Sequence, residues 1–403
     1  MSRSMLAATG LAAVVAVALA PRSGFAQSVA PDTDAIARTI VTENLGIAEG
    51  EKVLISGSVR DMQLLEDLAF HVRSVGAFPL LTVTSDRRME RESMELPARY
   101  DSETNALELA LMDAIDVSLL VAPDMSPDLM ASIPPERLAA QNAAYEPINR
   151  RTRERSVRFL EFGNSLAPTE WRAAQAGMSK DALAAMFWEG VGVDYAELER
   201  TGQAVRERLE NGREVHVTHP NGTDLRFQIG GRPVFVNDGV ISAEDRERGG
   251  AAILSWIPAG EAYTTAVPGS AVGVIFVPQT SYLDDPAPGS EIRNLRVEFR
   301  DGRVVSMTGE GPGFASFKAL YDAAGEGRET FGVLDIGLNP RIRLPEGSRL
   351  GSFVPAGSVT LAFGGDVWAG GENDVTWGDV RFLSGATVTV DGRALVQAGR
   401  LTP

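Results

Sequence analysis

The chain has 403 residues, of which 44% are hydrophobic and 23% are charged. This balance is typical of a globular protein with a large core. The formal net charge is −16, which argues against a nucleic-acid partner because phosphate binding needs a basic surface. The chain contains no cysteine, which excludes a thiol nucleophile, zinc–thiolate sites and iron–sulfur clusters.

The N-terminus has the pattern of a secretory signal. Arg3 precedes an apolar run over residues 6–20, and Gly24-Phe25-Ala26 offers small residues for cleavage before Gln27. The run is shorter than the roughly 20 residues that span a bilayer, although an uncleaved anchor is the alternative. We expect a signal peptide over 1–26, export to the periplasm or the medium, and no membrane span after its removal.

Residues 32–170 alternate between helical and strand patterns. Helical periodicity covers 35–44, 62–75, 106–114 and 135–144, and short apolar runs cover 52–56, 79–83, 117–121 and 157–162. Strand, helix and strand at these lengths predict parallel pairing with right-handed crossovers. The sequence therefore predicts a doubly wound α/β domain over 32–170.

Two connecting helices are expected over residues 171–212. The first covers 180–189 with Ser179 as its N-cap. The second begins at Asp194, where Glu197 completes a capping-box pattern, and it ends at Gly212.

Residues 213–403 read as a mostly antiparallel β domain. Asp301-Gly302 and Asp391-Gly392 are hairpin turn signals. One helix is expected over 315–324. The expected strands cover 214–218, 225–229, 272–277, 292–299, 303–307, 359–363 and 386–390.

Several short motifs in this order resemble the aminopeptidase T and aminopeptidase S family of metallopeptidases. They are Gly50-Glu51-Lys52-Val53-Leu54-Ile55, Gly222-Thr223-Asp224-Leu225, Pro258-Ala259-Gly260-Glu261-Ala262-Tyr263-Thr264, Gly337-Leu338-Asn339-Pro340, Leu361-Ala362-Phe363-Gly364, Gly370-Gly371-Glu372-Asn373 and Val390-Asp391-Gly392-Arg393. Each motif is weak alone, but the ordered set spans nearly the whole chain after the signal.

The resemblance implies a dimeric exopeptidase with two divalent metals, held by two glutamates, two histidines and an aspartate. Glu261 matches the first glutamate directly, and Asp335 stands at the second. The first histidine falls on Thr360. Asp379 could stand for the aspartate, whereas the second histidine and a nearby tyrosine have no counterpart. We therefore expect Glu261 as the catalytic residue and Glu261, Asp335 and Asp379 as metal ligands.

None of the three histidines of the chain is expected to rescue that site. His71 lies on a predicted helix, where a structural role is the ordinary one. His216 and His219 are three apart on a predicted strand, so their side chains point to opposite faces. The remaining donors are oxygens, which favour calcium, magnesium or manganese over zinc.

Further residues near these motifs are candidates for substrate contact or for support of the metal ligands. They are Asp366, Glu372, Asp374, Trp377, Thr360 and Thr376. The acids among the motifs are expected in loops that come together, and the alternative is that they solvate the loops of an acidic protein. The glycines at 309, 311 and 313 lack the spacing of a dinucleotide fingerprint, so no nucleotide or organic cofactor is expected.

The first hypothesis is an exported metal-dependent aminopeptidase that acts on peptide N-termini through a site rebuilt around carboxylates, using manganese, magnesium, cobalt or zinc. The second is a catalytically inactive descendant, a peptide-binding or structural module on the same homodimeric scaffold. A metal-free hydrolase ranks last, because no base with a recognisable partner is present and Gly-x-Ser-x-Gly is absent.

Overall fold

The computed structural model describes residues 32–402 apart from 123–125 and 283–286. The expected signal peptide lies outside the described residues. Within those residues, no helix combines the length and the apolar character needed to cross a membrane.

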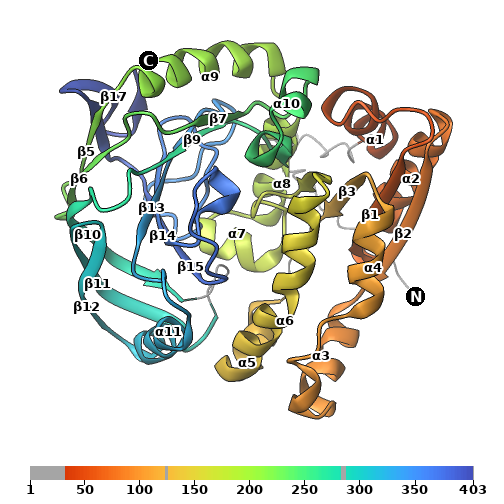
Figure 1. Cartoon of the computed structure of the whole chain (residues 1–403), viewed down its shortest axis with the longest axis horizontal. Coiled ribbons are helices and arrows are strands. Elements are labelled where there is room, and N and C mark those ends of the chain that lie inside the picture. The colour runs from red at the N-terminus through yellow and green to blue at the C-terminus, as the bar shows by residue number, and fades with distance from the viewer. Residues whose placement is uncertain (1–31, 123–125, 283–286, 403) are drawn as a thin grey trace, which may run out of the picture. The chain divides into compact units, whose positions relative to one another are not determined.

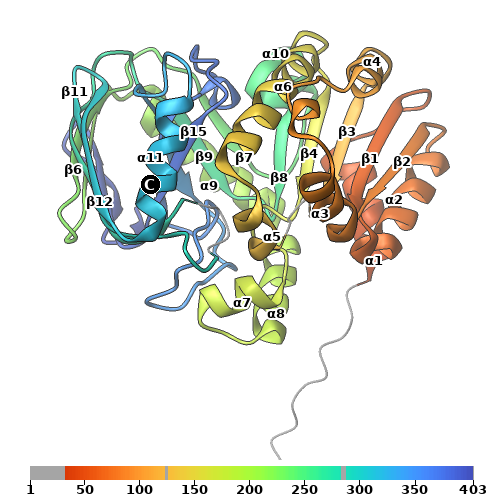
Figure 2. The ribbon, with the colours of Figure 1, turned by 90° about the horizontal axis from the view of Figure 1, so that it is seen from below.

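Four strands from the first half of the chain and one later strand form a parallel sheet, sheet A, with the order β2-β1-β3-β4-β8 (Figures 1 and 2). Its strands are β1 (Lys52–Ser58), β2 (Phe78–Thr84), β3 (Val117–Val121), β4 (Arg158–Phe162) and β8 (Leu254–Ile257). The strand β8 comes from the part of the sequence that was expected to belong to the β-rich domain. Sheet A therefore contains one strand from beyond the domain boundary that was expected at residue 212.

Helices accompany the parallel strands, and three of them, over 86–95, 127–132 and 170–176, were not predicted from the sequence. The helices are α1 (Thr33–Thr39), α2 (Met62–Ser74), α3 (Asp86–Glu95), α4 (Ala106–Ala114), α5 (Pro127–Ser132), α6 (Pro135–Glu154), α7 (Glu170–Ala176), α8 (Lys180–Val191) and α9 (Tyr195–Glu210). The side chains of Ser179 and Asp194 cap the N-termini of α8 and α9, as expected from the sequence.

The second half forms two antiparallel sheets. Sheet B has the order β12-β11-β10-β6-β5-β16-β17-β18, and sheet C has the order β15-β14-β13-β9-β7. Sheet B contains β5 (Glu214–Thr218), β6 (Asp224–Gln228), β10 (Val272–Ser281), β11 (Glu291–Arg300), β12 (Arg303–Glu310), β16 (Thr387–Val390), β17 (Arg393–Gln397) and β18 (Arg400–Leu401). Sheet C contains β7 (Val234–Asn237), β9 (Glu261–Thr265), β13 (Phe331–Gly337), β14 (Val359–Gly364) and β15 (Gly378–Leu383).

Sheets B and C pack around the largest hydrophobic core. Phe227 of β6 contacts Phe331 of β13, and Phe299 of β11 contacts Phe363 of β14. The helix α10 (Ala243–Arg248) lies in the connection before β8, and α11 (Pro312–Ala323) follows β12. Figure 2 shows the same ribbon from below. A parallel α/β half followed by a mostly antiparallel half confirms the predicted fold class.

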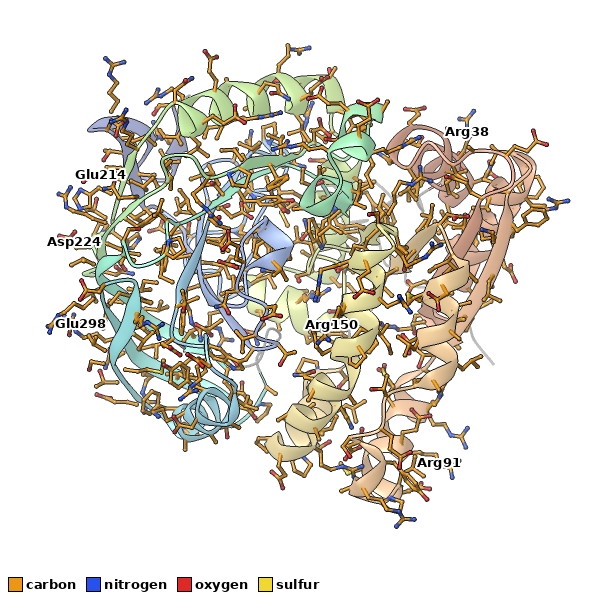
Figure 3. The ribbon with its side chains drawn as sticks, viewed as in Figure 1. Arg38, Arg91, Arg150, Glu214, Asp224 and Glu298 are labelled. Carbon is orange, nitrogen blue, oxygen red and sulfur yellow. The ribbon has the colours of Figure 1, made fainter. Side chains whose placement is uncertain are left out.

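The strands β5, β6 and β11 of sheet B bear part of the acidic surface. Figure 3 labels Glu214, Asp224 and Glu298 on these strands. The side chain of Asp224 is 71% exposed and that of Glu214 is 48% exposed. These carboxylates alternate along the strands with buried apolar residues such as Leu225 and Val297, the pattern of a sheet with one face in water.

Candidate active site

Glu261 and Asp335 lie on one face of sheet C. The residue opposite Asp335 on β9 is Tyr263, and the residue opposite it on β14 is Thr360. Residues opposite each other in a sheet point to the same face, and so do residues two apart on one strand. Glu261 is two residues before Tyr263, so its carboxyl group is a diagonal neighbour of Asp335. The two acids lie on strands, which corrects the expectation that they occupy loops.

The backbone conformation of Gly260, just before β9, positions Glu261. Gly260 has φ +125°, and a Cβ atom there would come within 2.8 Å of the backbone nitrogen of Asn339 on the neighbouring chain segment. Backbone hydrogen bonds fix both sides of this contact, from the Gly260 N–H to the Asn237 carbonyl and from the Leu338 N–H to the Gly260 carbonyl. Only glycine fits this approach, which explains the glycine before the glutamate in the motif.

Two asparagines flank the carboxyl group of Glu261. The Asn164 Nδ2 atom donates to Glu261 Oε1 at 2.6 Å and to the Pro258 carbonyl at 2.9 Å. Asn237 lies opposite Glu261 on β7, and its Nδ2 atom donates to the Trp256 carbonyl at 3.0 Å. Asn164 follows Gly163, the first residue after β4, so the end of a sheet A strand contributes to this site. Neither asparagine is among the site residues predicted from the sequence.

Asp335 has no comparable support. It is 1% exposed, and neither of its carboxyl oxygens has a hydrogen-bond partner among the described residues. The hydroxyl of Thr360, the residue opposite it on β14, also has none within the described chain. A buried polar group without a partner is costly, so these atoms require a proton, water or a cation.

The electrostatics of the pair follow from burial. Burial raises the pKa of Glu261 to about 7, while the amide groups of Asn164 and Asn237 act in the opposite direction. Burial and then the negative charge of Glu261 raise the pKa of Asp335 well above its ordinary value. Without a cation, the pair therefore holds at least one proton near neutral pH.

Aromatic side chains cover this face of sheet C. Tyr263 is 1% exposed and stacks on Phe235, and its ring centroid lies 5.6 Å from that of Trp368 and 6.5 Å from that of Trp256. Burial, followed by the charges of Glu261 and Asp335, raises the pKa of the Tyr263 phenol well above its ordinary value. Tyr263 is therefore a neutral neighbour of the two acids.

Asp379 lies away from the pair. Asp379 pairs with Phe363 on β14, and Phe382, three residues later, pairs with Thr360. The side chain of Asp379 therefore points to the face of sheet C opposite to that of Thr360 and Asp335. There Arg381 Nη2 donates to Asp379 Oδ1 at 2.5 Å. The structure thus does not bring Asp379 to Glu261 and Asp335, because an odd spacing along a strand reverses the side-chain direction.

The other candidates are also separate from the pair. Asp366 is buried and accepts a hydrogen bond from the Asn373 backbone N–H, so it organises its own loop. Glu372, Asp374 and Thr376 are exposed. Trp377 packs on Phe363, Phe317 and Tyr321, in the core shared with α11.

The three histidines have partners elsewhere. His71 Nε2 lies 2.8 Å from Asp34, and His216 Nε2 lies 2.7 Å from Asp224. His219 Nε2 lies 2.8 Å from the Ser384 carbonyl oxygen. Within the described residues, no three acids, histidines or cysteines form a group that could hold a metal ion. The residues present thus do not fit the two-metal centre that the resemblance implies, and the oxygens of Asp335 and Thr360 have no hydrogen-bond partner among the described residues.

Comparisons with known proteins agree with this architecture. Wild-type AmpT from Thermus thermophilus has 18% sequence identity and a TM-score of 0.68, with 92% of this chain and 99% of that chain covered. The 2,5-dihydroxypyridine dioxygenase from Pseudomonas putida KT2440 has 13% identity and a TM-score of 0.57, with 92% of this chain and 96% of that chain covered. No curated protein matches the chain. At these identities the structural matches show the fold alone.

The sequence itself matches a family profile. The profile described as thermophilic metalloprotease (M29) covers residues 30–321, which is more than half of the chain. This match confirms the resemblance that the ordered motifs indicated. The chain therefore belongs to the M29 family of thermophilic metalloproteases.

Proposed function

We propose that this chain is an aminopeptidase-like hydrolase that uses a single hard divalent cation, magnesium or manganese, held between Glu261 and Asp335. The observation that carries the proposal is the buried Asp335 carboxyl group without a hydrogen-bond partner among the described residues. A cation between two buried carboxylates would neutralise their repulsion. Oxygen donors without imidazole favour magnesium or manganese over zinc or cobalt.

The chain's own residues would prepare this site. Asn164 fixes the orientation of the Glu261 carboxyl group, and Thr360 adds a hydroxyl oxygen beside Asp335. When bound, a divalent cation polarises a carbonyl group and lowers the pKa of a bound water. The substrates we propose are peptides with a free N-terminus, as family membership suggests.

The test is the metal content of the purified chain after equilibration with magnesium, manganese, cobalt and zinc, measured by mass spectrometry. We expect near-stoichiometric manganese or magnesium, lost in both Glu261→Gln and Asp335→Asn. Asp224→Asn is the matched control, because it removes one exposed carboxylate and leaves the face of sheet C unchanged. Turnover of N-terminal peptide substrates should follow metal content across the four proteins.

A second candidate function is a peptide-binding or structural module without catalysis. The aromatic cover of Tyr263, Trp256 and Trp368 over this face, together with the missing imidazoles, favours it. In that case the pair would hold a proton in place of a cation. Retention of none of the four metals, together with peptide binding without cleavage, would decide for this module and against the hydrolase.

We further propose that the protein is exported after cleavage before Gln27 and that it forms a homodimer. The apolar run that follows Arg3 supports export, and family membership supports the homodimer. The mass of the protein recovered from the periplasm or medium tests the cleavage position. Light scattering on that protein tests the dimer, and a mass of about 43 kDa or less would contradict it.

A further inference from the structure

A separate pocket of about 200 Å³ opens at the carboxyl ends of β1, β2 and β3, and its lining includes neither Glu261 nor Asp335. From β1 the chain passes to β2 on one side and then returns to β3 on the other side. On one face of sheet A, Leu65 of α2 packs in the same cluster as Ile55, and on the other face Met112 of α4 packs with Leu54. The pocket thus lies at the topological switch point, where open α/β sheets bind ligands.

Hydroxyl groups line the pocket from two adjacent strands. Ser56 lies opposite Thr82, and Ser58 lies opposite Thr84 in the parallel register. The Ser56 Oγ and Thr82 Oγ1 atoms are 2.7 Å apart. Four small polar side chains on strand ends provide donors in fixed positions, the arrangement that orients a polar ligand.

The third strand meets the pocket in a strained conformation. Ala122 directly follows β3 and has φ +37°, which is unfavourable for a residue with a Cβ atom. Its carbonyl oxygen accepts a hydrogen bond from Arg60 Nη2 at 3.4 Å, and Arg60 Nε donates to Ser58 at 3.2 Å. Arg60 therefore connects the ends of β1 and β3 across the pocket lining. Such strain concentrates at ligand sites.

The charges of the lining indicate the class of ligand. Arg60 and Arg88 both line the pocket, and among the described lining residues Asp86 is the one acid. Arg88 lies in the first turn of α3, where its exposed side chain pairs with Glu92 at 2.8 Å. We propose that this pocket binds a small oxyanion, a carboxylate or phosphate group, which arginine and hydroxyl donors both recognise.

The test is calorimetric titration of the full mature chain with inorganic phosphate and, separately, with acetate. We expect saturable binding of at least one of the two anions, and the preferred anion distinguishes the phosphate class from the carboxylate class. Arg88→Gln should weaken binding by about threefold or more, since it removes one exposed cationic donor. Thr82→Val should also weaken binding, because it removes one hydroxyl at nearly constant volume.

The variant Asp86→Asn is expected to change the anion affinity in the opposite direction. Removal of the negative charge of Asp86 from the lining should tighten binding of a simple anion. Weaker binding in Asp86→Asn, no saturable binding of either anion, or equal binding in all variants would each overturn the proposal. Glu261→Gln should bind the anion as the unmodified chain does, so this result and that of the metal test are independent.

Discussion

Asn164 joins two parts of the molecule through one amide group. Its backbone has φ +41°, and its side chain donates to Glu261 and to the Pro258 carbonyl within the buried interior. A hydrogen bond to a charged group contributes about 1.5–3 kcal/mol. The conformational strain at Asn164 is tolerated because the amide holds the carboxyl group.

Substitution of Asn164 separates these two effects. We expect Asn164→Ala to lower the free energy of unfolding by about 2–4 kcal/mol, since it loses the hydrogen bonds and keeps the unfavourable φ. Asn164→Gly loses the same hydrogen bonds but adopts this φ readily, so it should be about 1 kcal/mol more stable than Asn164→Ala. Urea unfolding of the three proteins measures both differences. Equal stability of the two variants would show that the backbone there is unstrained.

Asp238, which lies outside the candidate metal site, is expected to make the stability of the fold depend on pH. Burial raises its pKa from 3.8 to about 6, and the charges of Asp245 and Glu199 add to the rise. Because the folded state binds the proton more tightly, stability is lost as the pH rises from about 4 to 6. The Asp238 side chain accepts a hydrogen bond from the Val240 N–H, which an asparagine oxygen can also accept.

We therefore expect Asp238→Asn to match the unmodified chain below about pH 4 and to exceed it above pH 6. The gain at pH 8 should be at most about 3 kcal/mol, since one pKa unit corresponds to about 1.4 kcal/mol. Denaturant unfolding of both proteins between pH 4 and 8 measures it. Parallel stability curves would contradict a raised pKa at Asp238.

At the scale of the element, the connection into β9 has little freedom. Gly260 has φ +125° and no room for a Cβ atom beside Asn339. We expect Gly260→Ala to destabilise the fold by at least about 2 kcal/mol, from strain and overpacking together. Gly231→Ala is the control, because Gly231 also has a positive φ but has no atom within 4 Å of an added Cβ.

Chemical denaturation of the two variants compares these contributions. Gly231→Ala should lose only the conformational part, about 1 kcal/mol. If Gly260→Ala loses no more than Gly231→Ala, then the approach of Asn339 does not fix the position of Glu261.

The elements that the sequence predicted well are those with local signals. The caps at Ser179 and Asp194 and the alternating strand β6 follow from short-range patterns. The strands β9 and β13 are buried along their entire length, so they lack the alternation that reveals a half-exposed strand. This is why Glu261 and Asp335 were expected in loops.

At the scale of the whole molecule, ordered motifs were sufficient for the family and the fold class. The composition of the candidate site required long-range pairing that no local pattern records. Asn164 and Glu261 are 97 residues apart, and the bond between them depends on β8 pairing with β4. The only sequence signal for Asn164 was its place after a predicted parallel strand, where ligand-binding residues gather.

The placement of β8 also determines whether the molecule can be divided. A fragment that ends at residue 212 would contain β1 to β4 but not β8, so β4 would become a bare sheet edge. Unpaired edge strands recruit other chains, and such a fragment is expected to aggregate. The complementary fragment from residue 213 would carry Glu261 without the amide of Asn164. The two halves of the sequence are thus not independent domains. A chimera that takes one half from a relative would have to transfer β8 together with the first half.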